Sequence, residues 1–255
     1  MNTRKPVEQK IMKKYLSFGG GVNSVAMMLM LLDQGDDFEA IFVDHGTDWP
    51  ETYEYTEMLQ NWLKDRGHKS IKILKPNLFR KKDGRTFDSL YDYAFFYKMI
   101  ASRMFRWCTA EFKVKPIHRY VKTPCFMYIG IDYGESHRAK ISTQSGIENR
   151  YPLIEHGINR SGCEKIIKDH GLAVPMKSGC YICPFQPNGQ WIELRKKHPE
   201  LFCKAQQLEI NAANHRIKRG KKPISIKSKS LKSIVDEDQM NLFEQDDYPP
   251  CQCGL

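Results

Sequence analysis

The sequence predicts an α/β protein whose core is a parallel sheet. Three short strand-like segments, residues 13–18, 38–46 and 69–76, alternate with two segments that have apolar residues at helical spacing, 23–35 and 51–67. A strand–helix–strand–helix–strand order is typical of a parallel sheet, whose strands are joined by right-handed helical crossovers.

The boundaries of these first elements are marked in the sequence. Gly35 and Gly67 each follow a helical segment, as expected for a glycine C-cap. The first helix is apolar on nearly every face, so we expect it to be buried. Asp44 stands at the carboxyl end of the second strand.

The rest of the chain is predicted to be mostly helical. Aromatic residues at helical spacing predict helix over residues 78–110, and an apolar run predicts a further strand over 125–132. Residues 159–172 form a predicted helix capped by Asn159 or Ser161. An irregular cysteine-bearing loop, 174–185, precedes one or two helices over 189–216, broken near Pro199.

Composition favours a cytoplasmic protein with a polyanionic partner. The sequence has no apolar run long enough for a membrane span, and its charged beginning has no signal-peptide apolar region. Lys and Arg outnumber Asp and Glu by 40 to 30, for a formal charge of +10. Such a charge is expected of a protein that binds a polyanion, although a merely basic enzyme fits equally well.

The chain divides into two predicted units. Residues 1–185 hold the α/β part and the cysteine loop, and 186–255 hold a helical segment, a basic stretch and a tail. From Arg216 the stretch RIKRGKKPISIKSKSLKS has eight basic residues and no acidic one, so it could follow a phosphate backbone or be a solvated linker. We expect the chain from about Arg216 to be less ordered than the body.

The segment YLSFGGGVNS, residues 15–24, has the layout of a phosphate-binding turn. Gly19, Gly20 and Gly21 let the backbone approach an anion, and Asn23 and Ser24 add side-chain donors at the first helical turn. The loop lacks the lysine of the common G-x-x-x-x-G-K-[ST] motif. The alternative is a tight turn that only permits close helix packing.

Five motifs in order resemble one superfamily. SFGGGVNS (17–24) resembles the S-F-S-G-G-K-D-S pyrophosphate loop of the adenine nucleotide α-hydrolases, which split ATP between the α and β phosphates or bind related adenylyl nucleotides. Three segments resemble phosphoadenylyl-sulfate (PAPS) reductases, and GCYICPF (179–185) resembles the C-x-x-C-P loop of their relatives. The three segments are FVDHGTDWPETYEY (42–55), RWCTAEFKVKPI (106–117) and GIDYGESHRA (130–139).

The resemblance implies a Rossmann-like core with a cysteine-bearing helical C-terminal extension. It also implies an ATP site with Mg²⁺, in which Lys113 and Arg138 face phosphate and Glu135 orients Arg138 or holds a metal. Asp44 and Thr47 would lie near the adenosine or its phosphates, although Asp44 could instead cap the turn after its strand. The implied phosphate loop comprises Ser17, Gly19, Gly20, Gly21, Asn23 and Ser24.

Three residues depart from the superfamily loop. Asn23 stands where the superfamily usually has Asp, Gly19 where it often has Ser, and Val22 where Lys is common. The change from Asp to Asn removes a negative charge beside the phosphates and weakens the case for Mg²⁺ positioning. ATP cleavage and simple nucleotide binding therefore both stay open.

The eight cysteines favour metal chemistry over structural disulfides in a cytosolic protein. Cys180 and Cys183 form a C-x-x-C whose geometry suits Zn²⁺ or an iron–sulfur cluster. The resemblance adds Cys108 as a cluster ligand. The fourth ligand is Cys163 or Cys203, or it is absent, which would leave one iron open to sulfide or substrate. A zinc site that uses Cys163 and His170, or plain buried thiols, are the alternatives.

The chain ends in CQCGL, and Cys253-Gly254-Leu255 matches part of the E-C-G-L-H segment of PAPS reductases, whose cysteine attacks the sulfonucleotide. A Cys253 thiolate on a flexible tail could carry sulfur into the nucleotide site. The alternative is a frayed terminus with incidental cysteines.

These features favour an ATP pyrophosphatase that adenylates nucleic acid for sulfur transfer, as in DNA phosphorothioation or tRNA thiolation. The expected partners are DNA or tRNA and a sulfur donor, such as a cysteine desulfurase or a thioredoxin-like protein; a homodimer is left open. Two alternatives remain: a PAPS or adenylyl-sulfate reductase, and a non-catalytic nucleotide-binding subunit of a modification or defence complex.

Overall fold

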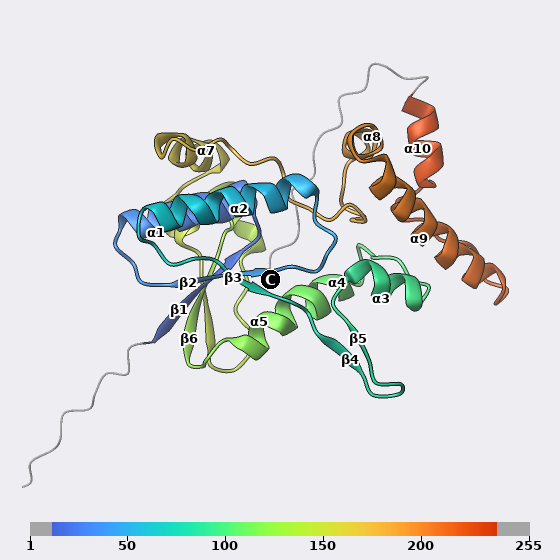
Figure 1. Cartoon of the computed structure of the whole chain (residues 1–255), viewed down its shortest axis with the longest axis horizontal. Coiled ribbons are helices and arrows are strands. Elements are labelled where there is room, and N and C mark those ends of the chain that lie inside the picture. Colours follow the sequence, from blue (N-terminus) through green and yellow to red (C-terminus); the bar gives the residue numbers. More distant parts are fainter. Residues whose placement is uncertain (1–11, 239–255) are drawn as a thin grey trace, which may run out of the picture.

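A five-stranded parallel sheet forms the centre of the molecule (Figure 1). The structure is a computed structural model that describes residues 12–238. The strand order is β3-β2-β1-β6-β7, so the chain moves outward from β1 to β3 and returns to the other side of β1. The strands are β1 (Lys13–Phe18), β2 (Glu39–Val43), β3 (Lys72–Leu74), β6 (Cys125–Ile129) and β7 (Ile147–Arg150).

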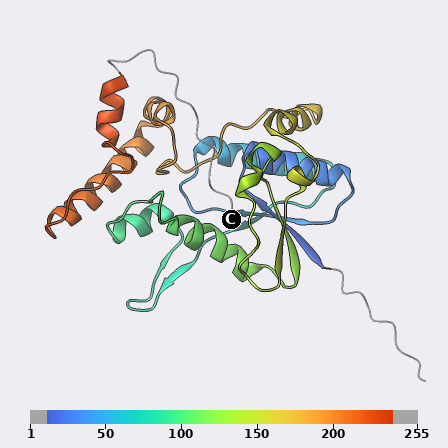
Figure 2. The same cartoon turned by 180° about the vertical axis from the view of Figure 1, so that it is seen from behind.

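Helices cover both faces of this sheet. Leu16 and Phe18 of β1 pack into an apolar core with α1, α2 and α7, whereas Tyr15 packs into a second core with α5 on the opposite face. Figures 1 and 2 show α1, α2 and α7 in one layer and α5 in the other. The elements are α1 (Val22–Asp33), α2 (Pro50–Asp65), α5 (Lys115–Tyr120), α6 (Pro152–Glu155) and α7 (Arg160–Asp169).

The predicted parallel α/β core is confirmed. The first three strands and the first two helices form where the sequence predicts them, and Gly35 and Gly67 follow their helices with positive φ values of 67° and 72°. Asn159 is the cap of α7, since its side chain accepts a hydrogen bond from the backbone N–H of Gly162 at 3.0 Å.

The prediction of helix over residues 78–110 is wrong for residues 78–89 and for the irregular segment 97–106. The segment 78–110 begins with an antiparallel hairpin, β4 (Leu78–Arg80) and β5 (Arg85–Phe87), and only then forms α3 (Leu90–Phe96). The turn contains Asp83 and Gly84, a pair that favours hairpins because glycine adopts the left-handed conformation, here φ 70°. The Asp83 carboxylate reinforces the turn by accepting from the Arg85 backbone N–H at 3.3 Å.

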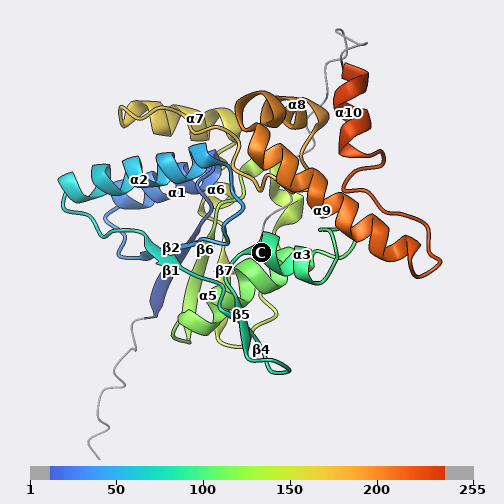
Figure 3. The same cartoon turned by 45° about the vertical axis from the view of Figure 1, so that its right-hand side comes forward.

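A third core lies beside the sheet and joins segments that are distant in the sequence. Trp49, Phe112, Tyr181, Trp191 and Leu231 all belong to it. Figure 3 shows its helices, α3, α8, α9 and α10, grouped at one end of the sheet. The remaining elements are α4 (Trp107–Thr109), a π-helical turn (Ala110–Val114), a 3₁₀ turn (Tyr133–Arg138), α8 (Asn188–Lys197), α9 (Pro199–Ile217) and α10 (Leu231–Asp238).

Residues on both sides of position 185 share this third core, and the boundary between the predicted units stays a prediction. The expected loss of order from Arg216 is wrong as far as residue 238, because Ile226 and Leu231 are buried in the third core. The buried Glu209 carboxylate on α9 accepts from the backbone N–H groups of both residues, at 2.9 and 3.0 Å. No helix within residues 12–238 has the length and apolarity needed to cross a bilayer.

Candidate nucleotide site and cysteine site

A cavity of about 820 Å³ opens at the carboxyl ends of β1 and β6. The order of the sheet changes direction here, since β2 lies on one side of β1 and β6 on the other. Open parallel sheets bind ligands at such a switch point. The cavity is lined mainly by parts of residues 17–24, 42–48, 113–117, 129–138 and 176–179, with Arg160, Gln190 and Glu193.

Two glycines give the loop after β1 its shape. Gly20 has φ 69°, and an added Cβ would lie 2.7 Å from Cγ2 of Thr52, so no other residue fits without strain. Gly130, at the end of β6, packs so closely on the loop that an added Cβ would lie 3.0 Å from the backbone nitrogen of Ser24. Gly20 itself does not line the cavity, in contrast to Gly19 and Gly21.

The amino end of α1 faces the cavity without a side-chain cap. Gly21 is the N-cap, and the first turn of the helix contains no acidic residue. The Ser24 hydroxyl, expected to face phosphate, instead stabilises the loop: it accepts from the Gly19 N–H at 3.3 Å and donates to the Gly21 carbonyl at 2.9 Å. The groups of this loop that are suited to an anion are then its backbone amides and the helix dipole.

Asn23 connects the loop to an acidic residue that the sequence analysis missed. Its Nδ2 donates to Oδ2 of Asp132 at 2.9 Å, and its Oδ1 is buried without a hydrogen-bond partner among the described residues. Asp132 follows β6 and lines the cavity. The carboxylate that the loop lacks at position 23 is therefore supplied from the neighbouring strand.

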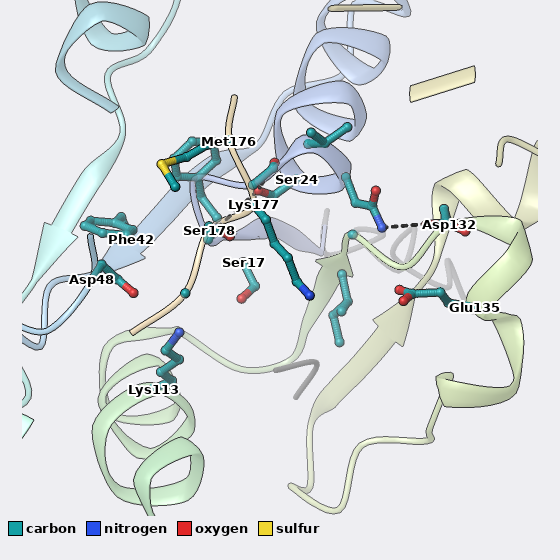
Figure 4. A pocket seen from close by; sticks show the side chains of 18 of the residues that line it. Ser17, Ser24, Phe42, Asp48, Lys113, Asp132, Glu135, Met176, Lys177 and Ser178 are labelled. Carbon is teal, nitrogen blue, oxygen red and sulfur yellow. Dashed lines mark hydrogen bonds between the residues drawn. The ribbon is translucent and has the colours of Figure 1, made fainter. Parts of the chain in front are cut away.

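A second missed segment, Lys177-Ser178, lies over the loop. An added Cβ on Gly21 would lie 2.5 Å from the Ser178 hydroxyl, which shows how closely the two segments pack. In Figure 4 the amino groups of Lys177 and Lys113 both point toward the middle of the cavity. Lys177 thus brings a cation to a loop that has Val22 where lysine is common.

Charge in the cavity is balanced between cations and acids. Glu135 forms an ion pair with Arg138, one of the two roles predicted for it. Burial and the nearby Asp132 charge raise the pKa of Glu135, and the Arg138 charge opposes that rise. Four cationic side chains (Lys113, Arg138, Arg160, Lys177) and four acidic ones (Asp48, Asp132, Glu135, Glu193) line the cavity. Such a mixture suits phosphates together with a hard cation.

Two predicted nucleotide contacts are placed elsewhere. Asp44 does not line the cavity; it accepts from the Gly46 N–H at 2.9 Å and the Tyr53 hydroxyl at 3.0 Å, and it pairs with Lys75. Burial alone would raise the pKa of Asp44, but these three hydrogen bonds lower it overall. Its role is the turn cap given as the alternative. Thr47 is fully buried behind the cavity.

A second, smaller cavity gathers three of the four predicted metal ligands. Cys108, Cys180 and Cys183 line it together with His45 and Arg106. The C-x-x-C loop is fixed against the chain after β2 by two backbone hydrogen bonds, from Trp49 N–H to Gly179 O at 3.2 Å and from Tyr181 N–H to Thr47 O at 2.8 Å. Backbone pairing thus brings the C-x-x-C loop beside the segment that contains His45 and Asp48.

Cys163 does not join this set. It lies on α7, fully buried in the core between α7 and α1, and burial raises the pKa of its thiol to about 12. A zinc site that uses Cys163 and His170 fails for the same reason, because His170 is the C-cap of α7, where it contacts the Ile166 carbonyl and Asp33. Cys203 is exposed on α9, and Cys253 lies outside the described residues.

The buried polar groups around the cysteines suit an anion beside Arg106 and a metal ion beside His45, Asp48 and Cys180. The guanidinium atoms Nε and Nη2 of Arg106 are buried without a hydrogen-bond partner among the described residues. His45, Asp48 and Cys180 bring ligand atoms within 4.8 Å of one another. Burial lowers the pKa of His45 to about 4, and Asp48 opposes that shift, so the imidazole is neutral at pH 7. Neutral imidazole and thiolates are the forms that bind soft metals.

Comparisons with known proteins agree with this geometry. A family model described as the phosphoadenosine phosphosulfate reductase domain matches residues 13–146. Two relatives from Methanocaldococcus jannaschii carry the names Uncharacterized protein MJ0973, 24% identical over 74% of this chain, and Uncharacterized protein MJ0066, 21% identical over 86%. This chain covers 45% of the length of each of these two relatives.

Proposed function

Because the chain belongs to the phosphoadenosine phosphosulfate reductase domain family, we propose that it is an ATP pyrophosphatase that adenylates nucleic acid for sulfur transfer. One observation carries this proposal: the nucleotide cavity and the cysteine cavity share a wall. Lys113 lines both cavities, and Asp48, which lines the first, accepts a hydrogen bond from the Cys180 thiol at 3.8 Å.

The nucleotide cavity has the groups that cleavage between the α and β phosphates requires. Backbone amides at the start of α1 bind the phosphates, and the cations Lys113, Arg138 and Lys177 stabilise the charge that moves to pyrophosphate. An acceptor oxygen attacks the α phosphorus, the bond to the bridging oxygen breaks, and pyrophosphate leaves. The product is an adenylated acceptor.

The shared wall supports sulfur transfer as the second step. A sulfide nucleophile, supplied by a partner donor, attacks the adenylated atom of the acceptor; the bond from that atom to the adenylate oxygen breaks, and AMP leaves. Lys113 is placed to hold the phosphate of AMP as the new bond forms. Cys253 stays a proposed sulfur carrier from the tail.

The residues present fit both proposed metals. Asp132, Glu135 and the unpartnered Oδ1 of Asn23 are hard oxygen donors suited to Mg²⁺. Cys108, Cys180 and Cys183 are thiolate donors for an iron–sulfur cluster, and Arg106 would balance its negative charge. When bound, the cluster would hold sulfide beside the activated acceptor; His45, Asp48 and Cys180 would hold Zn²⁺ as the alternative.

Pyrophosphate release from ATP tests the first step. We expect release in the presence of RNA or DNA, and a loss of at least about tenfold in kcat/KM for Lys177→Ala, because one phosphate contact is removed. Lys165→Ala is the matched control, since Lys165 is an exposed lysine paired with Asp169 on α7. Equal rates for the two variants would contradict the assigned cavity.

The family match favours a second candidate, a sulfonucleotide reductase. This enzyme would release sulfite from PAPS with thioredoxin and would need no ATP. Sulfite release without any ATP-dependent pyrophosphate release would replace the first proposal with the second. If ATP binds and both assays are negative, a non-catalytic nucleotide-binding subunit remains.

A further inference from the structure

A third cavity, of about 1050 Å³, is lined by cations and contains no acidic residue among the described part of the chain. It lies between the segment that follows α3 and the segment that begins at the end of α9. We name it the basic groove. Its lysines and arginines are Lys98, Arg103, Arg216, Arg219, Lys221 and Lys227.

Three cations of the basic groove have no acidic partner in the described part of the chain. Within residues 12–238, no carboxylate pairs with Lys98, Arg216 or Arg219. Partial desolvation, followed by the positive charges of Lys98, Arg219 and Lys218, lowers the pKa of His215, which also lines the groove. A concentration of cations that repel one another is stabilised by a bound polyanion.

The two walls of the basic groove are fixed in place. The Nδ2 of Asn211 on α9 donates to the Phe95 carbonyl of α3 at 2.8 Å, so the two helices lie side by side, as Figure 3 shows. Arg216 Nε donates to the Lys222 carbonyl at 2.8 Å, and Glu209 holds the segment near Ile226. A polyanion would therefore meet a preformed surface rather than a loose linker.

Exposed apolar side chains accompany these cations. Met104 is 84% exposed and Phe105 72% exposed, and Tyr97 lines the same groove. Bases of a single strand stack on such side chains while the phosphates contact lysine and arginine, whereas a duplex keeps its bases stacked within the helix.

The basic groove also leads to the cysteine cavity. Ala101 and Ser102 line both cavities, and Arg103 donates through Nε to the Pro184 carbonyl at 3.1 Å, next to Cys183. We propose that the basic groove binds a single-stranded polynucleotide and leads it toward the cysteines. This inference rests on the proposed function for the chemistry that follows binding, but not for the binding itself.

Fluorescence anisotropy with a labelled 12-nucleotide single strand tests the groove without ATP or sulfur. We expect Arg219→Glu/Lys221→Glu to weaken binding at least about tenfold at 100 mM salt and to flatten the salt dependence, because two cations are lost from the phosphate path. The matched control is Lys222→Glu/Lys232→Glu, which reverses two exposed charges of the same basic stretch outside the groove lining. Equal losses of single-strand affinity in the two variants would contradict the proposal that the basic groove binds the strand.

A second pair of variants tests stacking. Phe105→Ala should weaken single-strand binding about fivefold or more, whereas Phe79→Ala, which truncates a 64% exposed aromatic on β4, should leave it unchanged. RNA and DNA strands of one sequence show which sugar the groove prefers. A preference for duplex over either single strand, or complete competition by an acidic polypeptide together with no loss for Phe105→Ala, would overturn the proposal.

The outcomes separate this inference from the proposed function. If single-strand binding requires the groove residues but no pyrophosphate is released, the proposed binding groove is supported and the proposed adenylation is contradicted. If RNA or DNA stimulates pyrophosphate release equally in the wild type and in Arg219→Glu/Lys221→Glu, the adenylation is supported and the binding groove is contradicted.

Discussion

The nucleotide cavity and the cysteine cavity are neighbours, but they are held in different ways. In the first, close packing of strand ends and glycines sets the backbone: an added Cβ would lie 2.7 Å from Thr52 Cγ2 at Gly20 and 3.0 Å from the Ser24 nitrogen at Gly130. Side chains form the second, and they come from the loop after β2, from α4 and from the C-x-x-C loop. The first site therefore depends on the carboxyl ends of β1 and β6, and the second depends on the third core.

This difference predicts that the two sites fail separately. A substitution at Gly20 or Gly130 should weaken nucleotide binding before it affects metal binding, because close-packed backbone cannot relax around an added atom. Removal of a cysteine thiol should weaken metal binding before it affects nucleotide binding, because the third core still holds the remaining side chains in place. The following variants test whether the two sites are held independently.

The largest expected effect is on the cysteines. Cys180→Ser should abolish metal binding and sulfur transfer, because a hydroxyl replaces a thiolate ligand, while the Kd for ATP changes by less than about threefold. Metal content and the visible absorption spectrum of protein purified without oxygen measure the first, and titration calorimetry the second. Loss of ATP binding together with the metal would show that the two sites are not held separately.

Two other cysteines provide controls for that result. Cys203→Ser alters an exposed residue and should change neither metal content nor stability. Cys163→Ser should leave the metal in place but cost about 1–3 kcal/mol of unfolding free energy, because a hydroxyl is buried in the core between α1 and α7. Loss of the metal in Cys163→Ser would show that Cys163 is a metal ligand, as the sequence predicts.

The next largest expected effect is the weakening of ATP binding in Gly130→Ala. Gly130→Ala should weaken ATP binding about tenfold, because the new Cβ would lie 3.0 Å from the Ser24 nitrogen and would move the amides of the loop. Gly19→Ala adds the same atom where nothing lies within 4 Å, and it should change the Kd by less than about threefold. A reversed order would mean that the loop is not positioned by β6.

The sequence predicts the local part of this contrast better than the distant part. The glycine run between a strand and a helix predicts either a phosphate loop or a tight packing turn, and the resemblance of the whole segment favours the first. Lys177 and Asp132 escape notice because folding alone brings them to the loop. Arg106 and His45 are missed for the same reason, and Asp44 is misplaced because a position at a strand end does not fix the direction of a side chain.

The third core has its own weak point in Glu209, which accepts two backbone N–H groups. Glu209→Gln leaves one of them without an acceptor and should lower the unfolding free energy by about 1–3 kcal/mol near pH 5. Urea unfolding measures this. Glu200→Gln, an exposed change on the same helix, should cost less than about 0.5 kcal/mol.

The pH dependence of that difference has a defined sign. Burial raises the pKa of Glu209 above 4.5, in spite of the two hydrogen bonds. The native state therefore keeps this proton to higher pH than the unfolded chain does, and stability falls as the pH rises through the interval above 4.5. The variant lacks this proton, so its deficit should narrow from pH 5 to pH 7. A deficit that widens would mean that the hydrogen bonds outweigh burial.

The smallest effect concerns Asn23, which stands where the resemblance leads us to expect Asp. Asn23→Asp replaces the donor to Asp132 with a second carboxylate and should cost about 0.5–1.5 kcal/mol without divalent cation. Mg²⁺ should recover that loss, because two facing carboxylates bind a hard cation. Thermal unfolding with EDTA and with Mg²⁺ measures both, and Asn214→Asp, an exposed change of the same charge on α9, should show no Mg²⁺ response. If Mg²⁺ stabilises both variants equally, Asn23 does not face the cation, and its contact with Asp132 serves the packing of β6 against the loop.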